Sequence, residues 1–309
     1  MLWQRLTPLY DDGEAKAIVR MVMEERFGLS FADILCGKTD SLSDVERQEL
    51  EQIMCRLEKG EPVQYVLGTA TFCGRQFHVA PGVLIPRPET EKLVRGWNST
   101  LQSDVAFDTT SQPLDSKCSG LPPRLEERGL GGEASILDIG TGSGCIAITL
   151  ALENPDAYVE AWDISDEALA IARDNAKRLG ANVVFKKVDI LNPRPSTLAP
   201  LPFTTIISNP PYICEKERAT METNVLNYEP ETALFVPDDD PLLFYRHIAD
   251  FALTGLQADG ELRFETNPLY VEDVAAMLKE KGFTNVTIYP DQFGKQRFVR
   301  GHHQKNKKV

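Results

Sequence analysis

The second half of the chain alternates short apolar segments with longer amphipathic ones, and this alternation limits the possible folds more than any other feature. The short segments are typical of buried strands and the longer ones of helices that pack on a sheet. We expect strands at 136–139, 158–162, 183–185, 204–208, 261–264, 286–289 and 298–300, and helices at 145–152, 166–179, 242–253 and 271–281. Repeated strand–helix units predict an α/β fold with a doubly wound, mainly parallel seven-stranded sheet, in which ligands bind at the carboxyl ends of the strands.

A glycine-rich loop follows the first of these strands. The motif begins at Asp138, and residues 140–144 place glycine at every second position before the next helix. Glycines here allow a tight turn and let backbone N–H groups approach a ligand closely. The spacing differs from the dinucleotide-binding fingerprint and lacks the lysine of a phosphate-binding P-loop. A plain tight turn between strand and helix is the alternative.

Acidic residues close the next two strands. Asp163 can accept hydrogen bonds from both hydroxyl groups of a ribose. Its alternative role is to cap the next helix, although Ser165 or Asp166 can do the same. Asp189 can receive an adenine amino group while Ile190 packs on the ring, or it can be a turn aspartate. The glycine loop and Asp163 together favour a ribose-bearing ligand.

The strand at 204–208 ends at Asn209-Pro210-Pro211-Tyr212. Two prolines stiffen this turn and remove two backbone donors. The side-chain amide of Asn209 and the carbonyl of Pro210 can then accept both hydrogens of a planar –NH₂ group while Tyr212 packs on its plane. Such contacts would orient a weakly nucleophilic amide nitrogen and stabilise its developing positive charge. The alternative is a rigid surface turn.

The remainder of the chain divides into three segments. Residues 1–67 are expected to form a small helical bundle, with a capping box at Ser43 and Glu46 and a helix at 15–27. Residues 68–97 form a connector, with strand-like alternation over 72–84 and a stiff, extended proline segment at 85–91. Residues 98–134, rich in polar residues, proline and glycine, are predicted to be a flexible insertion between the bundle and the domain at 135–309.

Charge and cysteine content exclude several classes of protein. The 33 basic and 46 acidic residues give a net charge of −13, which argues against stable binding to nucleic acid. The six cysteines are scattered without metal-binding spacing, so we expect no metal and a reducing, cytoplasmic environment. Neither a membrane span nor a targeting segment is predicted.

These motifs resemble the class I S-adenosylmethionine-dependent methyltransferases, and the Asn-Pro-Pro-Tyr turn resembles their amino-group N-methylating branch. Further motifs are similar to the PrmC/HemK family, which methylates the glutamine amide in the Gly-Gly-Gln motif of bacterial peptide-chain release factors. These motifs are Ile85-Pro86-Arg87-Pro88-Glu89-Thr90-Glu91, Tyr228-Glu229-Pro230, Ala233-Leu234 and Gly294-Lys295-Gln296-Arg297.

The resemblance implies a function and a set of site residues. It implies transfer of a methyl group from S-adenosylmethionine to the amide nitrogen (N5) of that glutamine, leaving S-adenosylhomocysteine, with release factors as partners of a monomeric enzyme. The cofactor is expected at Asp138, Gly140, Thr141, Gly142, Ser143, Gly144, Asp163, Asp189, Ile190 and Asn209. The glutamine is expected at Asn209, Pro210, Pro211 and Tyr212. The helical bundle at 1–67 and the segment at 86–91, which contains Arg87 and Glu89, are expected to help dock the release factor. Asn209, Pro210 and Tyr212 are the expected catalytic residues.

Three departures from the family pattern and two other functions complete the hypotheses. Ile190 replaces an aromatic residue, residues 238–241 replace a glycine-rich turn, and residues 265–267 replace Glu-Ile-Gly; we expect altered loops and unchanged chemistry. The first alternative function is an adenine-N6 methyltransferase acting on DNA or RNA, against which the acidic charge counts. The second is a non-catalytic, cofactor-sensing protein, against which the intact Asn209–Tyr212 turn counts.

Overall fold

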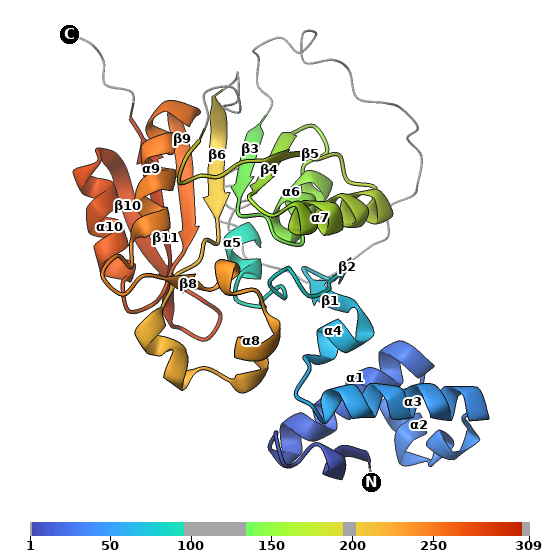
Figure 1. Ribbon diagram of the computed structural model, residues 1–309. Coiled ribbons are helices and arrows are strands. Elements are labelled where there is room, and N and C mark those ends of the chain that lie inside the picture. Colours follow the sequence, from blue (N-terminus) through green and yellow to red (C-terminus); the bar gives the residue numbers. More distant parts are fainter. Residues whose placement is uncertain (1, 96–133, 194–201, 305–309) are drawn as a thin grey trace, which may run out of the picture.

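The computed structural model describes residues 2–95, 134–193 and 202–304 (Figure 1). Its N-terminal part is helical and lies apart from the sheet-containing part, with a short hairpin between them (Figure 1). The helical elements are η1 (Leu2–Arg5), α1 (Asp12–Phe27), α2 (Phe31–Leu35), η2 (Lys38–Ser41), α3 (Asp44–Leu57) and α4 (Val63–Leu67). The predicted insertion at 98–134 lies outside the described residues, except for Ala134.

Local sequence signals begin and end these helices. The predicted capping box is confirmed, because the backbone N–H of Ser43 donates to Glu46 at 2.7 Å and that of Glu46 donates to the Ser43 hydroxyl at 3.3 Å. Helix α1 begins after Asp11, whose side chain accepts from a backbone N–H, and ends at Gly28 in the left-handed conformation. The apolar faces of α1 and α3 meet in a separate core that includes Met23, Met54 and Leu57.

The connector differs from its predicted form. A hairpin of β1 (Thr69–Phe72) and β2 (Arg75–His78) turns at Cys73 and Gly74, which both have positive φ. The strand expected to extend to residue 84 is therefore shorter and broken. The extended segment expected at 85–91 is wrong from Arg87 onward, where the backbone of Thr90 bonds to Arg87 and α5 (Glu91–Arg95) begins. Pro88 holds the residue before it in extended backbone and fixes its own φ, but that φ is compatible with a turn that begins at Pro88.

The sheet has the predicted architecture. Its order is β10-β11-β9-β6-β3-β4-β5, with β11 antiparallel to both neighbours and the remaining pairs parallel. The strands are β3 (Ser135–Ile139), β4 (Tyr158–Asp163), β5 (Val184–Lys187), β6 (Phe203–Ser208), β9 (Leu256–Glu265), β10 (Phe283–Pro290) and β11 (Gln296–His303). The principal helices are α6 (Cys145–Glu153), α7 (Asp166–Leu179), α9 (Leu243–Gly255) and α10 (Val271–Glu280).

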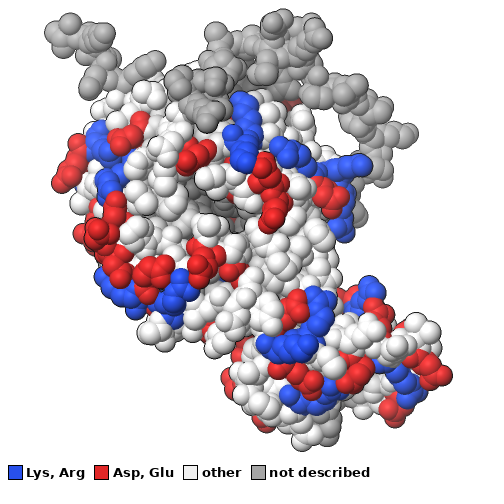
Figure 2. Space-filling model, viewed as in Figure 1, with Lys and Arg blue, Asp and Glu red and all other residues white. Residues whose placement is uncertain are grey.

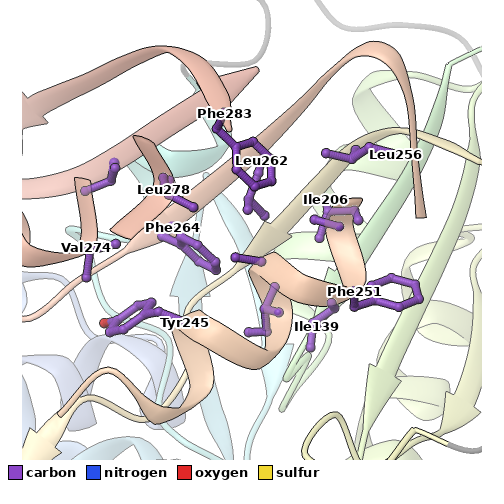
Figure 3. Packing of buried hydrophobic residues seen from close by; sticks show 14 of the residues in the cluster. Ile139, Ile206, Tyr245, Phe251, Leu256, Leu262, Phe264, Val274, Leu278 and Phe283 are labelled. Atoms are coloured by element: carbon purple, nitrogen blue, oxygen red, sulfur yellow. The ribbon is translucent and has the colours of Figure 1, made fainter. Parts of the chain in front are cut away.

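Each face of the sheet has its own apolar core. On one face, α9 packs on β9 and α10 packs on β10 and β11. The rings of Tyr245 and Phe264 meet edge to face there, with their centroids 5.2 Å apart (Figure 3). On the other face, α6 packs through residues such as Ile146 and Ile148 with Phe72 and Phe77 of the hairpin. The hairpin is therefore anchored to the sheet domain, which fixes where the connector enters the site.

Five short elements between β6 and α9 were not predicted. They are β7 (Ile213–Cys214), η4 (Glu215–Thr220), α8 (Thr223–Tyr228), η5 (Glu231–Ala233) and β8 (Phe235–Val236). The segment reaches from the sheet toward the helical bundle (Figure 1). There the hydroxyl of Tyr228 donates to the carbonyl of Lys59 at 3.0 Å. This excursion forms part of the site described below.

Within residues 2–95, 134–193 and 202–304, no helix is long and apolar enough to cross a membrane. The same residues contain no cluster of three potential metal ligands, and their cysteines are free: Cys36, Cys55, Cys73, Cys145 and Cys214. Basic and acidic side chains are interspersed over the visible face (Figure 2).

Candidate active site

A cavity of about 380 Å³ opens at the carboxyl ends of β3, β4 and β6, where the alternation of strands and helices predicts a ligand. We call it the loop cavity. Its lining combines the glycine loop, apolar side chains of the sheet and the Asn209 turn. Of the predicted cofactor residues, it is lined by Gly140, Gly142, Asp163, Asp189, Ile190 and Asn209.

The glycine loop is held against β4 by its backbone. The N–H groups of Gly140 and Thr141 donate to the carbonyl of Trp162 at 2.9 and 3.0 Å. Gly140 and Gly142 have positive φ, and a Cβ on either would meet no atom within 4 Å. Both therefore leave open space where other residues would place a side chain, which allows a ligand to approach the backbone.

Four of the predicted cofactor residues belong to the glycine loop or lie directly beneath it and do not line the loop cavity. Asp138 is fully buried beneath the loop and accepts from the Thr141 hydroxyl at 2.6 Å and from a backbone N–H of α6. Burial raises the pKa of Asp138 to about 7. The carbonyl of Ser143 accepts from Asn175 at 2.9 Å, and Gly144 begins α6. The contacts of these four residues therefore hold the conformation of the loop on the side away from the cavity: Asp138, Thr141, Ser143 and Gly144.

Asp163 connects the loop to the next helix and faces the loop cavity. Its carboxylate accepts from the N–H groups of Gly142 and Ser165, each at 2.9 Å. These contacts leave further lone pairs for a ligand, since an ionised carboxylate has about four acceptor positions. Burial raises the pKa of Asp163. Ser165, not Asp163, caps α7 by accepting from Ala168.

Asp189 and Ile190 line the same cavity beside Trp162 and Val188. The Asp189 carboxylate also accepts from the backbone N–H of Leu191 at 2.9 Å. Asp189 is therefore a turn aspartate and a wall of the cavity at once. Ile190 is buried, which gives this end of the cavity an aliphatic surface.

A second cavity, of about 310 Å³, lies on the other side of the Asn-Pro-Pro-Tyr turn. We call it the turn cavity. Asn209 and Pro210 line both cavities, whereas Pro211 lines only the loop cavity and Tyr212 only the turn cavity. The other walls come from the connector and from the unpredicted segment around α8, including Met221, Glu222 and Val225. The turn is thus a shared wall between two compartments.

The Asn209 side chain is held by a hydrogen bond to Thr90, which is in turn bonded to Glu265. Its Nδ2 lies 3.3 Å from Oγ1 of Thr90, and this hydroxyl lies 2.7 Å from Oε2 of Glu265. The hydroxyl of Tyr212 donates to Oε1 of Glu265 at 3.4 Å. Burial raises the pKa of Glu265 to about 7. The sequence motifs assign no role to Thr90 or Glu265, because only the folded chain brings these two residues together.

Arg87 lines the turn cavity, but Glu89 lines neither cavity. Arg87 donates to Glu229 at 2.6 Å, and the same buried carboxylate accepts from the backbone N–H of Ile85 at 3.2 Å. The negative charge of Glu89 raises the pKa of Glu265. Arg87 therefore forms part of the wall of the turn cavity, whereas Glu89 acts on Glu265 through its charge.

Comparison with known proteins identifies the family. Residues 4–68 match the PrmC N-terminal domain and residues 111–229 match the methyltransferase small domain. The release factor glutamine methyltransferase of Bacteroides thetaiotaomicron is 43% identical over 296 residues, which cover 96% of this chain and 95% of that protein. The chain belongs to the release factor glutamine methyltransferase family. Proteins of the same name from Flavobacterium psychrophilum and Streptococcus pneumoniae are each 35% identical, covering 96% and 94% of this chain and 95% and 93% of theirs.

The family membership confirms the predicted resemblance, and the sheet confirms the predicted fold class. The protein is an enzyme, and its methyltransferase fold and domain imply S-adenosylmethionine as the methyl donor. The described residues fit that group. Gly140 and Gly142 leave room for it, the Asp163 carboxylate can accept from a ribose, and Ile190 offers an apolar surface to a base.

The departures from the family pattern have local structural roles. Asn267 donates to the carbonyl of Tyr212 at 3.1 Å and to Glu217 at 2.9 Å, so it ties the end of β9 to the Asn209 turn. Asp238 accepts from the backbone N–H of Lys216 at 2.9 Å and joins η4 to the loop after β8. Both departures thus stabilise the segment that encloses the turn cavity.

Proposed function

We propose that this enzyme transfers the methyl group of S-adenosylmethionine to the side-chain amide nitrogen (N5) of the glutamine in the Gly-Gly-Gln motif of peptide-chain release factors. The observation that carries the proposal is the position of Asn209 and Pro210 in the wall between two cavities. A donor in the loop cavity and an acceptor in the turn cavity would meet at this wall. The names of the relatives support the same substrate.

The loop cavity is the proposed cofactor site. When bound, S-adenosylmethionine supplies an electrophilic methyl group on a sulfonium. Gly140, Gly142 and Asp163 would hold it at the sheet edge, and Asp189 and Ile190 would receive its adenine. Asp138, Thr141, Ser143 and Gly144 support this site by holding the loop, and the chemistry requires no metal.

The turn cavity is the proposed site of the glutamine side chain. The oxygen of the Asn209 side chain and the carbonyl of Pro210 would accept the two amide hydrogens, and Tyr212 would pack on the amide plane. These acceptors orient the nitrogen and stabilise the positive charge that develops on it as it attacks. Arg87 and Glu222 are the charged residues in the described lining, and the described hydrogen bond of the Asn209 side chain is to Thr90 and not to either of them. We propose that the proton passes to water.

The partners follow from this substrate. Release factors are the proposed partners, docked by the helical bundle and by the connector around Arg87 and Glu89. We also propose that the enzyme is a cytoplasmic monomer without stable binding to nucleic acid. The net charge of −13 supports the last point.

Incubation of the enzyme with a release factor and methyl-labelled cofactor tests the proposal. We expect label on the glutamine of Gly-Gly-Gln and none on a factor whose glutamine is replaced by alanine. Asn209→Ala should lower kcat by about 100-fold or more while the cofactor still binds, because an acceptor for the developing charge is lost. Labelling of the alanine-containing factor, or preferential labelling of adenine in DNA or RNA, would contradict the proposal.

A further inference from the structure

Thr90 lies between the proposed catalytic amide and a buried carboxylate. Its Oγ1 is 3.3 Å from Nδ2 of Asn209 and 2.7 Å from Oε2 of Glu265. Thr90 and Glu265 are 3% and 1% exposed, so bulk water does not compete for these bonds. The three residues come from the connector, the end of β6 and the end of β9. This contact thus joins three distant parts of the chain at the wall between the cavities.

The chemistry of Asn209, Thr90 and Glu265 determines which group donates and which accepts in each of the two hydrogen bonds. An ionised carboxylate only accepts, so Glu265 takes the single hydrogen of the Thr90 hydroxyl. The Thr90 oxygen can then only accept from Asn209, which requires the NH₂ end of the Asn209 amide to face Thr90. The oxygen of that amide is left on the opposite side.

The reverse orientation would oppose the reaction. If the amide turned over, its oxygen would face the lone pairs of Thr90 and its NH₂ group would face the incoming NH₂ of a glutamine. Two donors would then meet at the place where an acceptor is needed. Hydrogen bonds that end on a charged group are stronger than neutral ones, so the carboxylate at the end of the chain makes this orientation more secure.

We infer that Thr90 and Glu265 are positioning residues, which hold the Asn209 side chain with its oxygen toward the amide to be methylated. The inference rests on the proposed function of Asn209. Glu265 also accepts from Tyr212 through its other oxygen, so one carboxylate orients both the polar and the aromatic parts of the turn. Its position is itself secured, because its backbone carbonyl accepts from the Tyr245 hydroxyl at 3.3 Å.

Substitutions of Thr90 can distinguish the orientation of the Asn209 amide from a contribution of Thr90 to packing alone. Thr90→Val keeps the shape and removes the hydroxyl, whereas Thr90→Ser keeps the hydroxyl. A matched control is Thr149→Val, because Thr149 is also buried but its hydroxyl has no hydrogen-bond partner among the residues that the structure describes. Steady-state kinetics with a release factor, cofactor binding by calorimetry and a thermal unfolding scan are measured for each variant.

We expect Thr90→Val to lower kcat by about 10- to 100-fold, the range expected for loss of a hydrogen bond linked to a charged group. Cofactor affinity should be unchanged, Thr90→Ser should recover most of the rate, and Thr149→Val should match the parent enzyme. An unchanged kcat in Thr90→Val would overturn the inference, as would an equal loss in Thr90→Ser. Inactivity of the parent enzyme on release factors would instead overturn the proposed function.

Discussion

At the scale of single residues, the candidate site depends on two groups, Thr90 and Glu265, that line neither cavity. Asn209 has an amide that could face either way, and its orientation comes from Thr90 and Glu265 behind it. The pKa of Glu265 is raised to about 7, chiefly by burial. The charge of Glu89 also raises this pKa, whereas Arg297 and the hydrogen bonds from Thr90 and Tyr212 lower it. The orienting group therefore changes its protonation near neutral pH.

The kcat of the enzyme should depend on pH through the protonation of Glu265. Above about pH 7, Glu265 is ionised and accepts from Thr90; below it, the protonated carboxyl can donate to Thr90, whose hydrogen is then free to turn toward Asn209. We expect kcat to fall as the pH is lowered from 8 to 6, approaching about tenfold per pH unit in the acid limb. In Glu265→Gln, the rate should be lower at pH 8 and lose this dependence. The same acid limb in both proteins would contradict the prediction.

At the scale of elements, the glycine loop is positioned by the packing of two helices. Gly144 begins α6 with φ +82°, and a Cβ there would lie 2.8 Å from Ile148 Cδ1 and 3.1 Å from Ala172 Cβ of α7. Gly180 ends α7 with a similar φ of +73°, but a Cβ there would meet nothing within 4 Å. The two glycines share a backbone requirement, and only Gly144 also has a packing requirement.

A pair of alanine substitutions measures the difference. Gly180→Ala should lower the free energy of unfolding by about 1 kcal/mol, the cost of a left-handed conformation in a residue with a side chain. Gly144→Ala should lower it by about 2–4 kcal/mol, because overpacking between α6 and α7 is added to the same strain. Urea unfolding checks both values. Equal losses would show that α6 and α7 move apart without cost, contrary to the contact distances.

The elements also show what could be predicted from the sequence. The strands and helices around the sheet were predicted because a buried strand or an amphipathic helix leaves a regular apolar pattern. The elements β7, α8 and β8 are too short for such a pattern and are held by tertiary contacts. Thr90 and Glu265 are 175 positions apart, so their contact has no local signal. The loop and turn motifs predicted residues that line the two cavities, whereas the contacts of Thr90 and Glu265 behind Asn209 could be seen only in the fold.

At the scale of the whole molecule, the helical bundle is joined to the methyltransferase domain through contacts beside the turn cavity. The buried hydroxyl of Tyr65 donates to the carbonyl of Val83 at 2.5 Å, and Tyr228 of α8 donates to Lys59 of the bundle. Glu229, next to Tyr228, secures Ile85 and Arg87 of the connector. A protein substrate that touches both the bundle and the turn cavity would depend on this junction.

Glu229→Ala tests the dependence on the junction. The change leaves the buried N–H of Ile85 without its acceptor and Arg87 without its ion pair, so the free energy of unfolding should fall by about 1–3 kcal/mol. The KM for a release factor should rise about tenfold or more, because the loss of about 1.4 kcal/mol of binding free energy, through misplacement of Arg87 and the connector, corresponds to a factor of ten. Cofactor affinity should be unchanged, because Glu229 does not line the loop cavity. Glu231→Ala is the control: its bond to Arg218 is solvent-exposed, with Glu231 65% exposed, and such pairs contribute little. Equal KM values in the two variants would show that release factors are bound without help from the junction.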